Sequence, residues 1–177
     1  MDRKILVTYA SKYGATAEIA GKIGDVLRQA GFQVDLFSVD GVRDLAPYQV
    51  VILGSGVYIG QWNKEAAEFV KANEEALVDR QVWLFSSGPT GAGDPVALLE
   101  GWRLPDALRS VADRIQPRDI AVFHGFINPN KLNFLTKLVL KGMKKPFGDF
   151  RDWDAIIAWA GTIAAVNHLS SLVGGHN

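Results

Sequence analysis

The stretch YASKYGATAEIA, residues 9–20, joins a short apolar run to an amphipathic one and carries the signals that decide the fold. The run KILVTYA at 4–10 is typical of a buried strand. Residues 15–31 repeat apolar side chains at nearly the helical period and end at a glycine, so they predict a helix. A strand that passes into a helix through Ser11 and Gly14 places free helix amides at the strand's end, where an anion is stabilised.

The same alternation continues along the chain. It predicts further strands at 32–39, 49–56, 81–88 and 119–126, and helices at 64–78, within 94–115 with Pro105 interrupting, and at 152–169. Alternating strands and helices build a parallel sheet covered on both faces. We therefore expect one α/β domain over residues 1–177, with a doubly wound five-stranded sheet in three layers. Ligands of such folds bind at the carboxyl ends of the strands.

Composition narrows the function classes. The 177 residues are 48% hydrophobic and 21% charged, and they include no cysteine, so thiolate chemistry is excluded. Three scattered histidines predict no metal site. The formal net charge is zero, which argues against a nucleic-acid partner. With no signal peptide or membrane-spanning stretch recognised, we expect a cytoplasmic protein that can visit the inner face of a membrane.

The loop SKYGAT at 11–16 follows an S-x-x-G-x-T pattern and is neither a Walker loop nor GxGxxG. The hydroxyls of Ser11 and Thr16 and the amides of residues 12–16 could hold a phosphate monoester through hydrogen bonds, with little need for a cation. Lys12 either touches that phosphate or faces solvent. The alternative is a plain capped turn between a strand and a helix.

Two further loops end predicted strands. GSGVYIGQWN at 54–63 predicts a flexible loop in which Tyr58 or Trp62 stacks on a planar ring, unless either only packs on the neighbouring helix. SSGPTGAGDP at 86–95 offers backbone polar groups to a ring edge, or is simply a mobile connection. Taken together, the three loops suggest a phosphate site, an aromatic wall and a polar backbone edge.

With these loops in place, the chain resembles flavodoxin-type FMN domains, with Tyr13 standing where that family usually has a hydroxyl residue in its phosphate motif. Over nearly its whole length it is similar to the flavodoxin-like menaquinone-dependent protoporphyrinogen dehydrogenases. The residues that carry this similarity are ILVTYASKYGATAEIA, GSGVYIGQWNKEAAEFVK, AVFHGFINPNKLNFLTKLVLKGMKK and DWDAIIAWAGTIA. The third stretch belongs to a segment at 127–151 that short flavodoxins lack. The S-I-R-Y-G often found after that family's third strand is absent here, where Val57, Tyr58 and Ile59 precede Gly60.

The resemblance implies non-covalently bound FMN and no catalytic side chain. It implies that the first loop takes the phosphate and that the other two flank the isoalloxazine. The residues expected to bind the cofactor are therefore Ser11, Lys12, Tyr13, Gly14, Ala15, Thr16, Ser55, Gly56, Val57, Tyr58, Ile59, Gly60, Ser87, Gly88, Pro89, Thr90 and Gly91.

The segment at 130–145 has a physical interpretation of its own. On a helix, Lys137, Lys141, Lys144 and Lys145 would fall on one side, and Leu132, Leu135, Val139 and Met143 on the other. Residues 1–128 carry 13 Lys and Arg against 16 Asp and Glu, a net of −3, whereas residues 129–177 carry 6 against 3, a net of +3. Such a basic amphipathic helix can lie on an anionic membrane. Alternatively, its apolar side packs on the domain and its lysines face water.

Three hypotheses follow for function. The first is an FMN-dependent oxidoreductase related to protoporphyrinogen dehydrogenase, which passes electrons from a reduced substrate to a quinone. The second is a flavodoxin electron carrier that docks redox partner proteins. The third is a flavodoxin-like module that has lost FMN. His124, at the end of the fifth strand, is expected to be buried and hydrogen-bonded rather than catalytic.

Overall fold

Five parallel strands form the centre of the molecule in the computed structural model, which describes the backbone of residues 3–173 and the side chains of residues 3–170. Their order across the sheet is β2-β1-β3-β5-β6, which confirms the predicted doubly wound sheet. The bounds are Lys4–Ala10 for β1, Gln33–Ser38 for β2, Val50–Tyr58 for β3, Gln81–Ser87 for β5 and Ile120–Phe123 for β6. A short β4 (Gln61–Trp62) pairs antiparallel with the end of β3.

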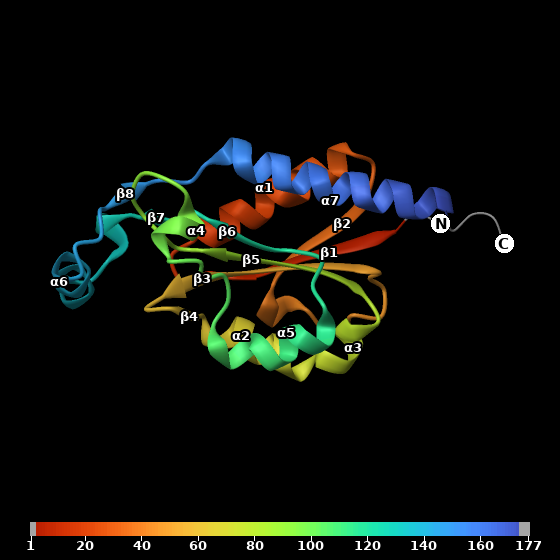
Figure 1. The fold of residues 1–177 in the computed structure, drawn as a ribbon, viewed down its shortest axis with the longest axis horizontal. Helices are drawn as coiled ribbons and strands as arrows, with labels where there is room; N and C mark the ends of the chain where they lie inside the picture. Colours follow the sequence, from red (N-terminus) through yellow and green to blue (C-terminus); the bar gives the residue numbers. More distant parts are fainter. Residues whose placement is uncertain (1–2, 174–177) are drawn as a thin grey trace.

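Helices cover both faces of the sheet (Figure 1). On one face lie α1 (Ala15–Gln29) and α7 (Trp153–Val173), and on the other lie α2 (Lys64–Ala72), α3 (Glu74–Val78) and α5 (Arg109–Ile115). The apolar sides of these helices and of the sheet form two buried clusters, one on each face. The remaining short helices are η1 (Val39–Gly41), α4 (Pro95–Leu98) and η2 (Asp106–Leu108).

Two predicted elements are divided in the structure. The helix expected at 64–78 breaks at Asn73, whose side-chain amide donates to the carbonyl of Phe69 at 2.9 Å. A side chain that bonds to the backbone in this way competes with the helical ladder. The strand expected at 119–126 ends at Phe123, and Phe126–Ile127 form a separate strand, β7.

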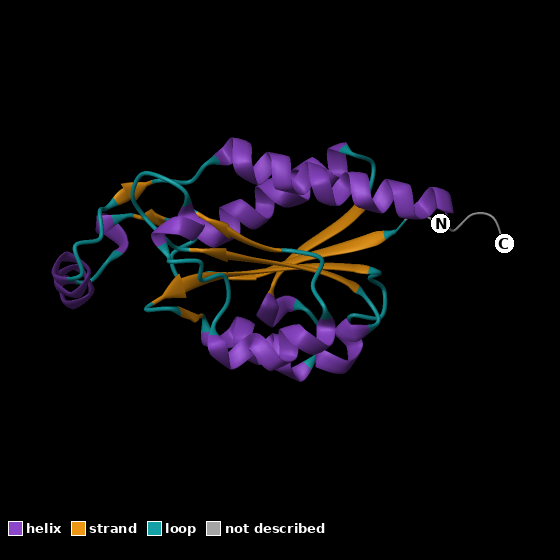
Figure 2. Ribbon diagram, viewed as in Figure 1, coloured by secondary structure: helices purple, strands orange, loops and turns teal. Residues whose placement is uncertain are grey.

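The segment at 127–151 projects from the end of the sheet where the parallel strands terminate, and its two ends lie together where it leaves the domain (Figures 1 and 2). Its base is the antiparallel pair of β7 with β8 (Gly148–Asp149). Between them the chain forms η3 (Pro129–Lys131) and α6 (Phe134–Gly142). The helix is shorter than the stretch 130–145 suggested. Within the described residues, no helix is both long and apolar enough to cross a bilayer.

Gly54 shows how tightly the centre of the sheet is packed. It lies in β3 under the ring of Phe85, and a Cβ at position 54 would lie 1.9 Å from Phe85 Cζ. We expect Gly54→Ala to lower the free energy of unfolding in urea by roughly 3 kcal/mol, the upper range for overpacking. The control is Gly161→Ala in α7, where the added methyl group meets nothing within 4 Å and should stabilise the helix by about 0.5–1 kcal/mol. Wild-type stability of Gly54→Ala would contradict this packing.

Candidate functional site

The loop between β1 and α1 is built to present backbone amides. Gly14 is the N-cap of α1 and has φ 93°, a left-handed conformation that glycine adopts without strain. Its amide donates to Ser11 Oγ at 3.0 Å, which closes the turn. The next amides, those of residues 15–17, open the helix and have no intrahelical acceptor, because the first intrahelical bond runs from the amide of Glu18 to the carbonyl of Gly14. Thr16 is buried beside them. The loop therefore has the form that an anion site requires.

The second loop is a tight hairpin and not the flexible loop that was expected. Tyr58 pairs with Gln61 across the β3–β4 turn, and the two turn residues have positive φ, 49° at Ile59 and 68° at Gly60. This is strained for Ile59, because branched side chains rarely adopt that conformation. Trp62 is buried in the core, and its Nε1 donates to Ser86 Oγ at 2.8 Å. The prediction that Trp62 could stack on a ligand is therefore wrong, whereas Tyr58 is exposed at the pocket.

Close backbone approach brings the loops together. An added Cβ at Gly88 would lie 3.0 Å from Val57 Cβ, and one at Gly125 would lie 3.0 Å from the carbonyl oxygen of Gly88. The ends of β3, β5 and β6 can therefore touch only because these positions lack side chains. Ser55 adds two hydrogen bonds near the end of β3. Its Oγ accepts from the amide of Asn63 at 2.9 Å and donates to the carbonyl of Gly56.

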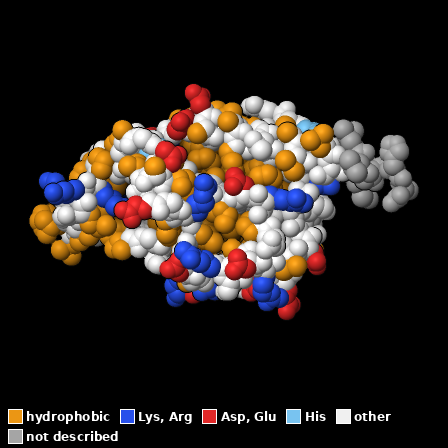
Figure 3. Space-filling view, viewed as in Figure 1, with side chains coloured by type: hydrophobic (Ala, Val, Ile, Leu, Met, Phe, Trp, Pro, Cys, Tyr) orange, Lys and Arg blue, Asp and Glu red, His pale blue; other side chains and the backbone are white. Residues whose placement is uncertain are grey.

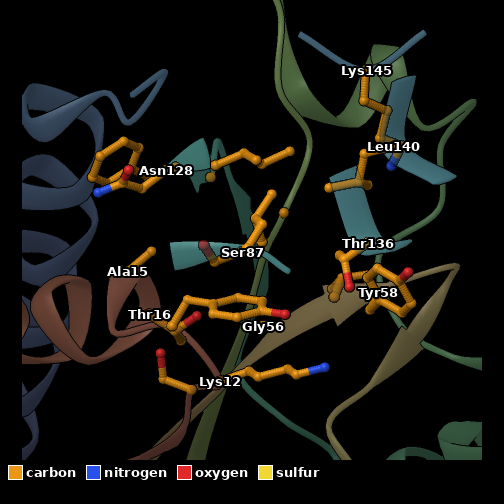
Figure 4. A pocket seen from close by; sticks show the side chains of 18 of the residues that line it. Lys12, Ala15, Thr16, Gly56, Tyr58, Ser87, Asn128, Thr136, Leu140 and Lys145 are labelled. Carbon is orange, nitrogen blue, oxygen red and sulfur yellow. The ribbon is translucent and has the colours of Figure 1, made fainter. Parts of the chain in front are cut away.

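These loops line one pocket at the carboxyl ends of β1 and β3, the paired strands whose following helices, α1 and α2, lie on opposite faces of the sheet, which is the switch point of the fold. The space between its lining residues is about 880 Å³, open solvent at the mouth included. Figure 4 shows Ala15 and Thr16 on one side and Thr136 with Tyr58 on the other. The sequence-predicted residues that line it are Ser11, Lys12, Tyr13, Ala15, Thr16, Gly56, Val57, Tyr58, Ile59, Ser87 and Gly88.

Six expected residues do not line the pocket: Gly14, Ser55, Gly60, Pro89, Thr90 and Gly91. Instead, Gly14 and Ser55 form hydrogen bonds that hold the first two loops, and Gly60 occupies a turn position with positive φ. The third loop is held by His124, whose two ring nitrogens lie 3.1 Å from the Pro89 carbonyl oxygen and 2.7 Å from that of Gly93. The expectation that His124 is buried and hydrogen-bonded is confirmed.

The inserted segment supplies much of the pocket wall that sequence reasoning missed. The additional lining residues are Asn63, Gly125, Phe126, Ile127, Asn128, Leu132, Thr136, Leu140, Met143 and Lys145. The signal was present as Thr136 and Leu140, four residues apart and therefore on one side of a helix. The prediction divided the segment into a basic side and an apolar side, and neither side included Thr136 or Leu140.

The outer side of α6 is apolar and exposed. Phe134 is 77% exposed and Leu135 71% exposed, and Leu138 and Val139 are also exposed. The alternative in which the apolar side packs on the domain is therefore wrong for Leu135 and Val139, whereas Leu132 and Met143 of that side line the pocket. Figure 3 shows hydrophobic side chains gathered at this end of the molecule, with basic side chains beside them.

The electrostatics of the pocket favour anions. The charged residues that line it are Lys12 and Lys145. Lys12 is exposed, and its Nζ lies 5.3 Å from the ring centre of Tyr13 and 5.9 Å from that of Tyr58. It thereby bridges the first two loops at the mouth, an arrangement stabilised by cation–π attraction.

Arg151 fastens the inserted segment to the domain. Its guanidinium donates to both carboxylate oxygens of Asp149, at 2.8 and 2.7 Å, and also pairs with Glu18 in the first turn of α1. The group lies 5.1 Å from the ring centre of Phe126 and 4.7 Å from that of Trp153. The hydrogen bond from Arg151 lowers the pKa of Asp149, and the same bond raises the pKa of Arg151.

Comparisons with known proteins agree with this geometry. A family model described as a flavodoxin domain matches residues 6–154. A flavodoxin of Streptococcus pneumoniae is similar in structure, with TM-score 0.57, 19% identity and coverage of 92% of this chain and 98% of that one. Flavodoxin 1 of Bacillus cereus has TM-score 0.57, 16% identity and coverage of 93% and 98%.

A larger protein also shares the fold. The rubredoxin oxygen:oxidoreductase of Desulfovibrio gigas has TM-score 0.57 and 15% identity, with 92% of this chain covered. This chain spans about a third of that protein, 35% of its length. No curated protein matches the sequence.

The Asp149–Arg151 pair predicts how the attachment of the segment responds to pH. Because the folded-state pKa of Asp149 is lowered, its carboxylate stabilises the attachment above its ordinary pKa of about 3.9, and this contribution is lost as pH falls through the lowered value. We expect amide exchange in the β7–β8 pair, corrected for intrinsic rates, to be constant between pH 7 and 5 and to accelerate below about pH 4.

The matched variants make the prediction specific. Asp149→Asn should accelerate that exchange already at neutral pH, because it removes an acceptor of Arg151. Asp154→Asn, which changes an exposed carboxylate at the start of α7, should leave it unchanged. Wild-type exchange in Asp149→Asn would mean that the pair does not hold the segment.

Proposed function

This chain belongs to the flavodoxin domain family, and from that premise we propose that it is an FMN-dependent oxidoreductase that passes electrons from a reduced small molecule to a quinone. Flavodoxin domains bind FMN and transfer electrons, so the cofactor of this chain is FMN. The observation that supports an enzyme is α6, which lines the cofactor pocket with one side and presents apolar residues to solvent with another.

The residues of the pocket fit FMN. The left-handed Gly14 and the free amides after it suit the phosphate. An added Cβ at Gly56 would lie 3.2 Å from Thr16 Oγ1, so glycine there keeps space beside the phosphate loop. Deeper in the pocket, apolar side chains such as Val57 and Leu140 can flank a ring system.

Bound FMN supplies the ability to accept and release electrons, and the chain's residues do the rest. The hydroxyls of Ser11 and Thr16 and the amides at the start of α1 would orient the phosphate. Tyr58, Ile59 and Leu140 would exclude water from the ring's surroundings. The charged residues that line the pocket are Lys12 and Lys145, and we assign neither of them a role as acid or base.

Protoporphyrinogen is the substrate that we propose. It carries carboxylates, which suit a pocket whose charged lining residues are Lys12 and Lys145. The similarity to protoporphyrinogen dehydrogenases includes the inserted segment, which forms one wall of that pocket. Each turnover would remove two electrons and two protons from the porphyrinogen and convert one quinone to its quinol, and three turnovers would convert one porphyrinogen to porphyrin.

An electron carrier that docks redox proteins is the second candidate. It is favoured by Tyr58 and Ile59, which are 44% and 59% exposed at the pocket mouth and could contact a protein surface. The zero net charge argues against it, because electrostatic steering would favour a strongly charged carrier. Reductive titration separates the two candidates, since a carrier should take up its electrons in two resolved one-electron steps.

The direct test is anaerobic oxidation of protoporphyrinogen with a naphthoquinone acceptor. We expect the FMN-loaded protein to produce porphyrin with the loss of three quinones per porphyrin formed. The flavin-free protein, and free FMN at the same concentration, are the controls and should do neither. Loaded protein that reduces a one-electron acceptor protein but leaves porphyrinogen unchanged would favour the carrier and contradict the enzyme.

We further propose that the outer side of α6 binds an anionic lipid surface, where a lipid-soluble quinone is found. The exposed Phe134, Leu135, Leu138 and Val139 form an apolar strip on this helix, and the exposed Lys141 and Lys144 lie beside it. Apolar residues flanked by lysines are complementary to an anionic bilayer. Cosedimentation with vesicles tests this second proposal.

For that test, wild type should sediment with vesicles that contain phosphatidylglycerol, and less with neutral vesicles or at high salt. Leu135→Gln with Leu138→Gln should weaken partitioning at least about tenfold, because two apolar side chains are lost from the lipid contact. Leu169→Gln, at an exposed leucine of α7, should bind as wild type. The lipid proposal would be overturned if the wild-type protein does not bind anionic vesicles, or if it forms dimers through this strip instead.

A further inference from the structure

Lys131 brings a cation from the inserted segment to the phosphate loop. Its Nζ donates to the carbonyl oxygen of Tyr13 at 3.1 Å. The same Nζ lies 3.8 Å from the position that a Cβ of Gly14 would occupy. Tyr13 and Gly14 immediately precede α1, so the ammonium group lies at the start of that helix although 118 residues separate Lys131 from Tyr13.

Local structure fixes the backbone at Lys131, whose side chain is exposed. Lys131 ends η3, which Pro129 opens and whose preceding residue, Asn128, accepts a hydrogen bond from the amide of Asn130 at 3.0 Å. Just before this turn, β7 is paired with β8 and tied down by Arg151. The lysine is therefore presented to the phosphate loop by a short, closed turn.

The position is electrostatically unfavourable without an anion. The start of a helix carries a partial positive charge, and a lysine is usually stabilising at the opposite end. Arg151 also approaches the first turn of α1, but its charge is balanced by Asp149 and Glu18. Among the residues that the structure describes, no carboxylate lies within ion-pair distance of Lys131.

We propose that Lys131 pairs with the phosphate of the cofactor, and that the inserted segment thereby makes the chain selective for phosphorylated flavin. This inference rests on the proposed binding of FMN at this loop. It replaces the expectation that the phosphate needs little help from a cation. A hydrogen bond between an ammonium group and a phosphate is strong and salt-dependent. Because the same segment forms one wall of the pocket, the stability of that wall would then depend on whether the phosphate is bound.

Riboflavin, which lacks the phosphate, allows a direct test. Binding of FMN and of riboflavin is measured by quenching of flavin fluorescence at low and high salt. We expect Lys131→Met to raise the Kd for FMN about tenfold or more at low salt and to flatten its salt dependence, with the Kd for riboflavin unchanged. Lys131→Arg should retain most of the affinity for FMN. Lys71→Met, at an exposed lysine of α2 that does not line the pocket, should bind both flavins as wild type.

Two results would overturn the inference while FMN binding stands. One is Lys131→Met that binds FMN as tightly as wild type. The other is an equal loss of FMN and riboflavin affinity, which would mean that Lys131 only supports Tyr13. Wild type that binds neither flavin would overturn the proposed function itself, and this inference with it.

Discussion

The backbone amides that open α1 are the feature on which the rest of the structure depends. They have no acceptor within their own helix, and they lie at the carboxyl end of β1, beside its paired neighbour β3. A parallel sheet whose neighbouring connections run to opposite faces leaves a crevice at that point. Gly14 turns the chain into the helix without strain, and so the amides face the crevice. The phosphate of a cofactor would supply the hydrogen-bond acceptors that these amides lack within the fold.

The inserted segment converts this open crevice into a pocket. Its helix α6 supplies one wall through Thr136 and Leu140, while Arg151 and Lys131 attach its two ends close to the start of α1. The segment is therefore connected to the phosphate loop at both of its ends. A surface contact at the outer side of α6 would be only one helix diameter away from the cofactor, which suits an exchange of electrons with an acceptor held in a lipid surface.

Local patterns predicted the elements that are fixed by local forces. The periodicity of 15–31, the continuous apolar run at 49–56 and Gly14 before a helix were enough to place β1, α1, β3 and the first loop. The interruption near Pro105 was also recognised, since proline ends helices by itself.

What sequence reasoning missed depends on contacts between distant segments. Whether Trp62 stacks on a ligand or packs inside the protein was left open, and the structure decides it, because the indole donates to Ser86 on another strand. Gly125 gave no signal, because its role is to let the backbone approach Gly88. The lining role of Leu140 and the placement of Lys131 required the path of the inserted segment, which the β7–β8 pair determines. The sequence of the segment alone contains no pattern that indicates these contacts with residues far away in the chain.

The most direct test of the central claim is a map of amide NMR shifts as FMN is added to the flavin-free protein. If the phosphate loop and the inserted segment form one site, the largest shifts will fall on the amides of 12–16 and, together with them, on 128–140. Shifts confined to 12–16 would show that the segment is not part of the site. Shifts absent from 12–16 would contradict the whole account.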